Sequence, residues 1–280
     1  MAMWYKFRMY PNKEQIQQIH HTFDCCRYVY NHFLGRGIDL YKKSGKTMSF
    51  DDCMAALSLI KGKKEWLNEP DPIALETTLW DLVNAFQNLS YRAENGEKPG
   101  FPQFRKEENP HKSYTLTCIG DNIAVLEKHI ELSKLGKVKA VVHRPVQGNI
   151  LKVTLSYSPS GNYYISICTD LETPQNQPTG AYAALYRKTE ARVAASEDIA
   201  NPNYKHILES EKKLAKAKRE MERKITGSSN WEKARIKVAK IEEKLENQRA
   251  YGRSILTKEL LKAHDISGLE DLSLNPDLEP

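Results

Sequence analysis

The sequence lacks the features that mark membrane, secreted and zinc-binding proteins. It contains no run of about 18 apolar residues, and its first residues, Met-Ala-Met-Trp-Tyr-Lys, do not resemble a signal peptide. None of its five cysteines belongs to a Cys-x-x-Cys pair, and the adjacent Cys25 and Cys26 do not have the spacing of metal ligands. These absences predict a cytoplasmic protein with no membrane partner, whose thiols are reduced and mostly buried.

A strong excess of charge is also missing. The 42 Lys and Arg residues exceed the 36 Asp and Glu residues only slightly, so the formal net charge is +6 for 280 residues. A nucleic-acid partner must therefore be argued from where the positive charges lie, not from their number. The length allows two domains, and the 40% hydrophobic content is ordinary for a globular protein.

The first third of the chain combines one strand with several helices. Trp4 to Tyr10 alternates bulky apolar side chains with basic ones, which predicts a strand. Asn12 can cap the helix that follows, and this helix is expected to reach a weak point at Gly35 and Gly37. Asp71 can cap a later helix that has a proline in its first turn. Helical periodicity covers residues 12–34, 50–61 and 71–89.

The rest of the chain is predicted to form a β-rich region and then a strand-helix domain. Strand-like patterns extend from Ser113 to Asp170 with a hairpin turn at residues 158–162, and the basic residues between them favour a basic β-barrel. After a linker at residues 173–178, two short apolar runs precede a long helical pattern at residues 205–263. This order is typical of a domain that opens with a β-hairpin.

The helical pattern at residues 205–263 is predicted to fold into an antiparallel hairpin. Apolar residues recur at helical spacing on two arms, and Ser229 and Glu232 form a capping box at the start of the second arm. Basic residues outnumber acidic ones on the first arm. A solvated helix face explains this charge, and contact with phosphates explains it equally well.

Three short blocks carry a resemblance to a known family. Residues 26–34 read Cys-Arg-Tyr-Val-Tyr-Asn-His-Phe-Leu, residues 101–106 read Phe-Pro-Gln-Phe-Arg-Lys, and residues 265–272 read Asp-Ile-Ser-Gly-Leu-Glu-Asp-Leu. Rings interleaved with cations suit single-stranded or A-form RNA, because rings stack on bases and cations meet phosphates. Core packing is the plainer interpretation of the first block, and an exposed basic turn that of the second. Taken together, the blocks make residues 4–275 resemble TnpB, the RNA-guided nuclease of IS200/IS605-type transposons.

The resemblance implies an α+β multidomain protein. A wedge-type β-barrel would comprise residues 1–10 and 96–172, and a helical recognition lobe, residues 11–95, would be inserted after its first strand. The linker would lead to a truncated, degenerate RuvC-like domain of the RNase H fold, residues 179–280, which contains the helical hairpin and no zinc ribbon.

One strand departs from the family pattern at a position that binds metal in TnpB. The family's Gly-Ile-Asp-Leu-Gly corresponds here to Gly180-Ala181-Tyr182-Ala183-Ala184, so a tyrosine replaces the first catalytic acid. A phenol with a pKa near 10 cannot replace a carboxylate that bridges two divalent cations at pH 7. The second acid corresponds to Glu270, which would be vestigial, and the third acid and the zinc ribbon would follow Pro280. A shifted alignment is the alternative, and it would use Glu190, Glu197 or Asp198.

This combination resembles the nuclease-dead TnpB-like repressors known as TldR. We therefore expect no nuclease activity, no catalytic metal and no zinc. The expected cofactor is a guide RNA similar to an omega RNA, and the expected target is double-stranded promoter DNA beside a short transposon-adjacent motif (TAM). A monomeric ribonucleoprotein in the nucleoid of a prokaryotic cell would block RNA polymerase by occupancy. The alternatives are a residual RNA-guided metal nuclease, a decayed transposon protein that binds only RNA, and a repressor that needs no RNA.

The resemblance also implies two sets of contact residues. Those expected to contact TAM DNA lie at the start of one predicted helix, along the next and in the predicted barrel: Phe50, Pro72, Glu76, Thr77, Asn84 and Ile119. Glu76 replaces a Gln type that could read adenine, and its carboxylate prefers the amino group of cytosine. Those expected to contact RNA are basic, aromatic or amide residues of the first strand, the first two blocks and the segment after them: Lys6, Arg8, Arg27, Tyr30, Asn31, Phe101, Phe104, Arg105, Lys106 and Tyr114.

Overall fold

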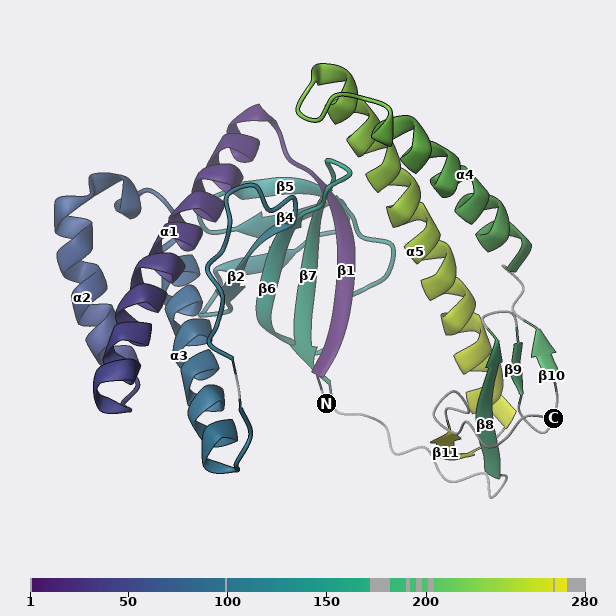
Figure 1. Cartoon of the computed structure of the whole chain (residues 1–280), viewed down its shortest axis with the longest axis horizontal. Coiled ribbons are helices and arrows are strands. Elements are labelled where there is room, and N and C mark those ends of the chain that lie inside the picture. The colour runs from purple at the N-terminus through teal and green to yellow at the C-terminus, as the bar shows by residue number, and fades with distance from the viewer. Residues whose placement is uncertain are drawn as a thin grey trace. The chain divides into compact units, whose positions relative to one another are not determined.

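The computed structural model of the chain describes residues 2–98, 100–171, 182–189, 192–194, 198–200, 204–263 and 265–270. The chain divides into two compact units, Met1–Thr173 and Pro174–Pro280 (Figure 1). The linker predicted at residues 173–178 lies outside the described residues. Within the described part of the chain, no helix is both long enough and apolar enough to cross a membrane.

The first unit contains an antiparallel sheet in which the first strand occupies a central place. Its strands, as far as the structure describes them, follow the order β2-β6-β7-β1-β5-β4-β3. They comprise β1 (Ala2–Tyr10), β2 (Lys112–Thr117), β3 (Ile123–Val125), β4 (His129–Leu132), β5 (Gly136–Val141), β6 (Asn149–Tyr157) and β7 (Tyr163–Asp170). A seven-stranded sheet with helices is compatible with the predicted α+β class, and the closed wedge-type barrel stays a prediction.

The alternation of β1 divides the sheet into a buried and an exposed face. Tyr5, Phe7 and Met9 are buried, whereas the residues between them are exposed. Side chains of a strand point alternately to opposite faces, so these three lie on one face. They share one apolar core with buried residues of the helices that follow β1.

Helix α1 (Lys13–Ser44) begins where the sequence predicts and extends further. Asn12 and Gln15 form a capping box, in which each side chain bonds the backbone of the other residue. The expected weak point at Gly35 and Gly37 is wrong, because the helix continues through both. A Cβ atom on Gly37 would lie 2.6 Å from the ring of Phe86, so this glycine allows two helices to approach closely.

Two more helices complete the helical part of the first unit. Helix α2 (Phe50–Lys63) is capped by Ser49, and a short 3-10 helix, η1 (Glu65–Asn68), leads to α3 (Pro72–Glu94). The Asp71 carboxylate accepts a 3.0 Å hydrogen bond from the Ile73 amide and a second bond from the hydroxyl of Ser133 in the β4–β5 turn. The predicted cap of α3 is therefore confirmed, and it also ties this helix to the sheet.

The second unit combines a small sheet with a helical hairpin. Strands β8 (Tyr182–Thr189), β9 (Arg192–Ala194), β10 (Asp198–Ala200) and β11 (Asp265–Glu270) have the order β10-β9-β8-β11, with β11 parallel to β8. Helices α4 (Tyr204–Glu222) and α5 (Ser229–Ala263) form the predicted hairpin. The predicted cap is displaced by one residue, because the Trp231 amide donates to Ser228 Oγ at 3.1 Å.

Candidate nucleic-acid interface

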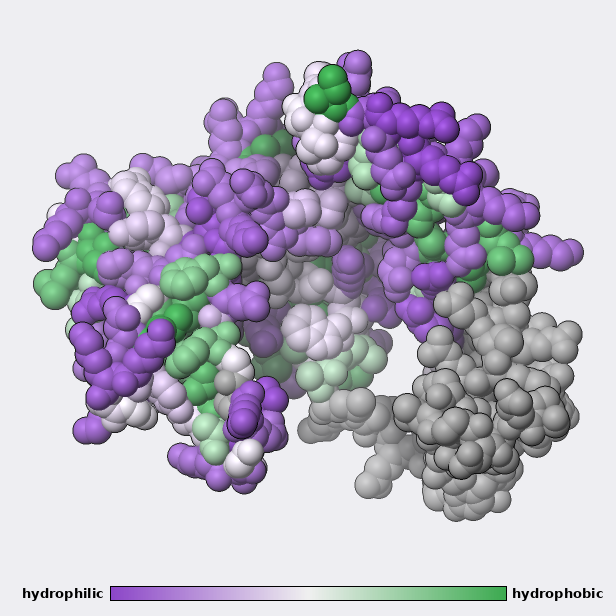
Figure 2. All heavy atoms as spheres, in the orientation of Figure 1, coloured by the Kyte–Doolittle hydropathy of each residue, from purple (hydrophilic) through white to green (hydrophobic). Residues whose placement is uncertain are grey.

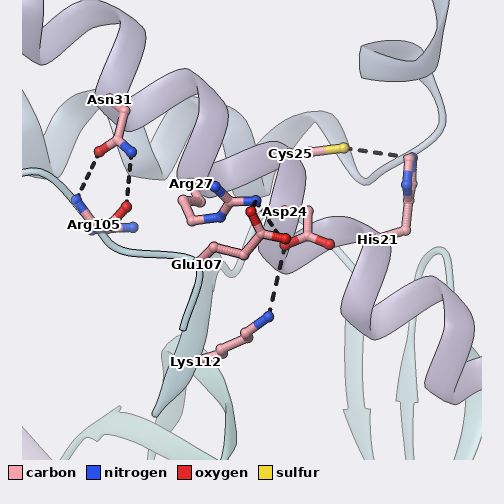
Figure 3. Close-up of polar contacts among 8 residues, drawn as sticks. All are labelled: His21, Asp24, Cys25, Arg27, Asn31, Arg105, Glu107 and Lys112. Atoms are coloured by element: carbon pink, nitrogen blue, oxygen red, sulfur yellow. Dashed lines mark hydrogen bonds and ion pairs between the residues drawn. The ribbon is translucent and has the colours of Figure 1, made fainter. Parts of the chain in front are cut away.

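Asn31 of α1 holds the Phe101–Lys106 segment against the helix (Figure 3). Its Nδ2 donates to the carbonyl oxygen of Arg105, and the Arg105 amide donates back to Oδ1, both at 2.8 Å. These bonds join residues 74 positions apart, one in each of the two aromatic-basic blocks. The two blocks therefore form one continuous surface.

The Arg105 side chain is fixed by the same helix. Its guanidinium lies 3.9 Å from the centre of the Tyr30 ring, which is close enough for a cation–π interaction. Tyr30 is buried, and burial raises the pKa of its phenol. Burial also raises the pKa of the Asp81 carboxyl, while the nearby Arg105 charge opposes this shift. Arg105 is thus a positioned cation on a rigid support.

A basic pocket lies beside this contact. It has a volume of about 200 Å³, and its lining residues are Phe23, Asp24, Arg27, Arg105, Lys106, Asn109, His111, Lys112 and Ser113. Helix α1 supplies the first three of these residues, and the chain before and within β2 supplies the others. The side chains that meet here are chiefly donors of hydrogen bonds, as an anion site requires.

Acidic side chains neutralise part of the charge in the basic pocket (Figure 3). Asp24 pairs with Arg27 at 3.3 Å and with Lys112 at 3.8 Å, and Glu107 lies 3.6 Å from Arg27. Lys106 has no ion pair with any of the described residues, and the buried Nε of Arg27 has no hydrogen-bond partner among them. The pocket therefore keeps donors for which a phosphate oxygen is a suitable acceptor.

The structure brings together only some of the residues expected to contact RNA. Arg27, Tyr30, Asn31, Arg105 and Lys106 meet at the basic pocket or its edge, and Phe101 and Phe104 lie on the same segment. Asn31 and Tyr30 support the segment and present little free surface.

Three other predicted RNA contacts lie elsewhere. Tyr114 is buried against Phe23, with a ring-centroid distance of 5.5 Å, so it belongs to the core. Lys6 and Arg8 lie on the exposed face of β1. Lys112, which the sequence reasoning missed, directly follows a histidine at the start of a predicted strand, and that adjacency was its only signal.

The residues expected to read DNA are arranged around α3. Glu76, Thr77 and Asn84 lie on this helix, and Pro72 occupies its first position. The Thr77 hydroxyl lies 3.3 Å from the Thr117 hydroxyl at the end of β2, close to the exposed Ile119. The structure thus places these predicted contacts on α3 and on the chain that follows β2, except for Phe50, which begins α2.

Sequence reasoning missed Trp80 on the same helix. Its side chain is 52% exposed, and its ring packs edge-to-face against that of Phe50, at a centroid distance of 5.1 Å. Trp80 lies four residues after Glu76 and four before Asn84, so the three share one face of α3. This four-residue spacing was the signal that could have found it. We call Pro72, Glu76, Thr77, Trp80 and Asn84 the α3 face.

Two parallel strands of the second unit carry the positions expected for nuclease acids. Tyr182 begins β8 and Glu270 ends β11, and Asp265 is in register with Tyr182. Carboxylates such as those of Asp265 and Glu270 are suitable Mg²⁺ ligands, whereas a neutral phenol is not. The side chains of both strands, and the alternative acids Glu190 and Glu197, lie outside the described part, so no coordination follows. Among the described side chains, no three His, Cys, Asp or Glu residues could hold a metal ion.

The cysteines are free and mostly buried, as predicted. Only Cys118 is partly exposed, and burial raises the pKa of Cys25 to about 12 and those of Cys26 and Cys53 to about 11. A thiol with such a pKa is protonated at neutral pH and reacts slowly.

Comparison with known proteins gives matches at both ends of the chain. A model of the IS605 OrfB proteins described as a helix-turn-helix domain matches residues 1–46, and a second, described as a probable transposase, matches residues 167–276. In this structure, residues 1–46 contain strand β1 and the single continuous helix α1.

Two relatives align with nearly the whole chain. A protein of Streptomyces pristinaespiralis is 28% identical over 276 residues, which are 96% of this chain and 67% of the relative. InsQ of Escherichia coli (strain K12) is 26% identical over 276 residues, which are 97% of this chain and 66% of the relative. The chain thus spans about two thirds of the length of either protein. Both are named as RNA-guided DNA endonucleases.

These names correct one prediction from the sequence. The replacement of an acid by Tyr182, together with a third acid and a zinc ribbon expected after Pro280, led us to expect no nuclease activity. Relatives that align with almost the entire chain are named as endonucleases, which points to nuclease activity in the family. These departures from the family pattern are therefore not sufficient ground for the loss of activity.

Proposed function

Because the chain belongs to the TnpB family, the OrfB proteins of IS605-type transposons, we propose that it binds a guide RNA and uses it to recognise double-stranded DNA. Base pairing between guide and target strand would supply most of the sequence specificity, and the protein would read RNA by shape and backbone. The names of the relatives support this proposal.

The observation that carries the proposal is the junction between Asn31 and Arg105. It joins the two aromatic-basic blocks into one surface beside a pocket that contains unpaired donors. Cations held by a rigid helix meet phosphates at a low entropic cost, because their side chains are already ordered. We assign RNA phosphates to this basic pocket.

We further propose that the α3 face reads the TAM. Glu76 can accept a hydrogen bond from the amino group of cytosine, and Thr77 can bond either partner of a base pair. Trp80 supplies an exposed ring beside them. Glu76 and Asn84 are partly exposed on either side of Trp80, and a helix face that carries such polar side chains suits the major groove.

The domain assignment belongs to the same proposal. We assign the sheet of the first unit to a wedge domain, α1 to α3 to a recognition lobe, and the second unit to a RuvC-like domain. The parallel pairing of β8 with β11 and the hairpin of α4 and α5 support the last assignment.

The decisive experiment sequences the nucleic acids that the protein binds in cells. We expect a discrete RNA, and an enriched DNA segment complementary to one end of it. In an electrophoretic mobility-shift assay, purified protein with this RNA should bind the matched DNA duplex and not a scrambled duplex. Recovery of random RNA would favour an RNA-binding remnant, and DNA binding that survives ribonuclease would favour an RNA-independent repressor. Either result would refute the proposal.

A charge variant tests the basic pocket directly. Lys106→Gln should weaken guide-RNA binding and reduce the slope of log K against log salt concentration by about one. Lys43→Gln is the matched control, because Lys43 is exposed in the last turn of α1. An equal slope for both variants would exclude Lys106 as a phosphate contact.

Cleavage and repression are separate read-outs of the guided complex. Binding in EDTA measures recognition alone, and adding Mg²⁺ to the same duplex measures the endonuclease activity named for the relatives. A complex placed at a promoter would exclude RNA polymerase by occupancy, so repression of a reporter gene measures binding in cells. We propose one protein chain per RNA, which light scattering can check.

A further inference from the structure

The exposed face of β1, β7 and β6 has a composition that the basic pocket does not explain. Trp4, Lys6, Arg8 and Tyr10 alternate with the buried residues of β1. Trp4 pairs with Cys168 of β7, and Cys168 pairs in turn with Lys152 of β6, so these positions share one face. Figure 1 shows the three strands side by side, and Figure 2, in the same view, shows mostly pale and purple residues over them. We call this surface the outer face.

Two large rings lie in water on the outer face. Trp4 is 50% exposed and Tyr10 47% exposed, although both belong to a central strand. The solvated side of an antiparallel sheet ordinarily carries polar residues. Rings exposed in a group are typical of a surface that receives a partner.

Each ring of the outer face has a cation beside it. Lys152 Nζ lies 5.8 Å from the centre of the Trp4 ring, and Lys6 Nζ lies 4.6 Å from that of Tyr164. The Arg8 guanidinium lies 5.2 Å from the Tyr10 ring. The outward positions of the described segments 4–10, 152–156 and 164–168 include no acidic residue. The Asp81 carboxyl of α3 interacts with Lys152, whereas Lys6 and Arg8 have no acidic partner among the described residues.

Rings interleaved with cations match the chemistry of unpaired nucleotides. An unpaired base exposes its flat faces to an aromatic ring, whereas a base inside a duplex is covered by its neighbours. The cations would meet the phosphates that connect such bases. Hydroxyl groups of Thr154, Ser156 and Ser166 lie between the rings, and they can bond the 2′-hydroxyl that distinguishes RNA from DNA.

We infer that the outer face is a stacking platform for a single-stranded segment of RNA, with Trp4 as its principal ring. The inference rests on the proposed function in one respect: it takes the bound RNA to be part of the guide RNA. An ordinary solvated sheet face is the competing interpretation. It predicts that removal of one ring leaves RNA binding unchanged.

The test uses the full chain, freed of cellular RNA, and an oligouridylate of about ten nucleotides, which is a typical single-strand site size. Trp4→Ala should weaken binding roughly 5- to 150-fold, the usual effect of losing one base–ring stack. Trp4→Phe keeps a ring and should restore most of the affinity. The fluorescence of Trp4 is the part of the wild-type emission that Trp4→Phe lacks. Binding of the RNA should quench this part. Tyr91→Ala is the matched control, because Tyr91 is 68% exposed on α3.

Three outcomes would overturn the inference. Equal RNA affinity of the wild type and Trp4→Ala would show that the ring does not stack. A similar loss for Tyr91→Ala would show that any exposed ring contributes. Binding of oligodeoxyuridylate with the same affinity, and the same loss on Trp4→Ala, would refute the choice of RNA.

Failure of the platform and failure of the proposed function are distinguishable. Circular dichroism spectra and unfolding midpoints of the variants check that the fold is intact. If Trp4→Ala keeps its RNA affinity while the wild type shows guided DNA binding, only the platform is wrong. If Trp4 stacks on RNA while no guided DNA binding occurs, the platform stands and the proposed function fails.

Discussion

Asn31→Ala should release the Phe101–Lys106 segment from α1 without unfolding the first unit. The substitution removes both hydrogen bonds between the Asn31 amide group and the Arg105 backbone. Alanine is favourable in a helix, so α1 itself should not suffer. The change is therefore confined to the contact that joins the two blocks.

The expected magnitude follows from the two bonds. Each has a length of 2.8 Å and is partly buried, and such a bond contributes about 1 kcal/mol net. Their joint loss should lower the free energy of local opening by about 2 kcal/mol, which corresponds to roughly 30-fold faster exchange of the Arg105 amide hydrogen. The Tyr30–Arg105 contact remains and limits the effect.

Hydrogen–deuterium exchange measured by mass spectrometry on peptides that contain Arg105 checks this prediction. Limited trypsin digestion gives a second measure, because cleavage after Arg105 and Lys106 requires the segment to leave the helix. The RNA affinity should fall together with the protection of the Arg105 amide hydrogen from exchange, since Arg105 and Lys106 lose their fixed positions.

Asn88→Ala is the matched control, because Asn88 is an exposed asparagine on helix α3. It should leave exchange at Arg105 unchanged. If Asn31→Ala also leaves it unchanged, the segment is held by other contacts and the reasoning fails. If exchange accelerates throughout the first unit, Asn31 supports the whole fold instead of one segment.

Three further predictions concern stability and reactivity. Gly37→Ala should lower the free energy of unfolding by about 1–3 kcal/mol in urea titrations, because its methyl group meets an aromatic ring, whereas Gly35→Ala, whose nearest neighbour lies 4.0 Å away, should be neutral or stabilising. Iodoacetamide at pH 8 should modify Cys118 and spare Cys25, and mass spectrometry should detect modified Cys25 only after unfolding. Burial, aided by Lys112, lowers the pKa of His20 below its ordinary value of 6.5, so the native state binds fewer protons there than the unfolded state. Stability should therefore fall as the pH drops below 6.5, and His20→Asn should flatten this dependence in unfolding measured from pH 7 to 5.

Sequence patterns predicted the features that depend on neighbouring residues. The alternation of β1 and the Asp71 cap are local, and the structure contains both. The break expected at Gly37 is wrong, because this glycine makes room for the ring of Phe86, which lies 49 positions later on another helix. The capping box expected at Ser229 failed by one residue, since Ser228 competes for the same role.

The candidate site shows the same division between local and distant causes. The two aromatic-basic blocks were recognisable as sequences, but their junction through Asn31 depends on residues 74 positions apart. Periodicity cannot reveal such a contact, and it did not indicate that Tyr114 would be buried. The expectation of lost nuclease activity failed for a related reason, because it rested on Tyr182 and on an acid and a zinc ribbon expected after Pro280, while the relatives align over 276 residues.

The alternation of β1 specifies the core and the outer face together. A shift of one residue in its register would place Trp4, Lys6 and Arg8 in the core and move Tyr5 and Phe7 into water. Such a shift would bury the charges of Lys6 and Arg8 among apolar side chains, so it is strongly disfavoured. The cations and rings of the outer face are therefore held in a fixed order by the same pattern that stabilises the sheet. Substitutions at outward positions should remove the proposed RNA contacts without loss of the fold, whereas substitutions at inward positions should remove both.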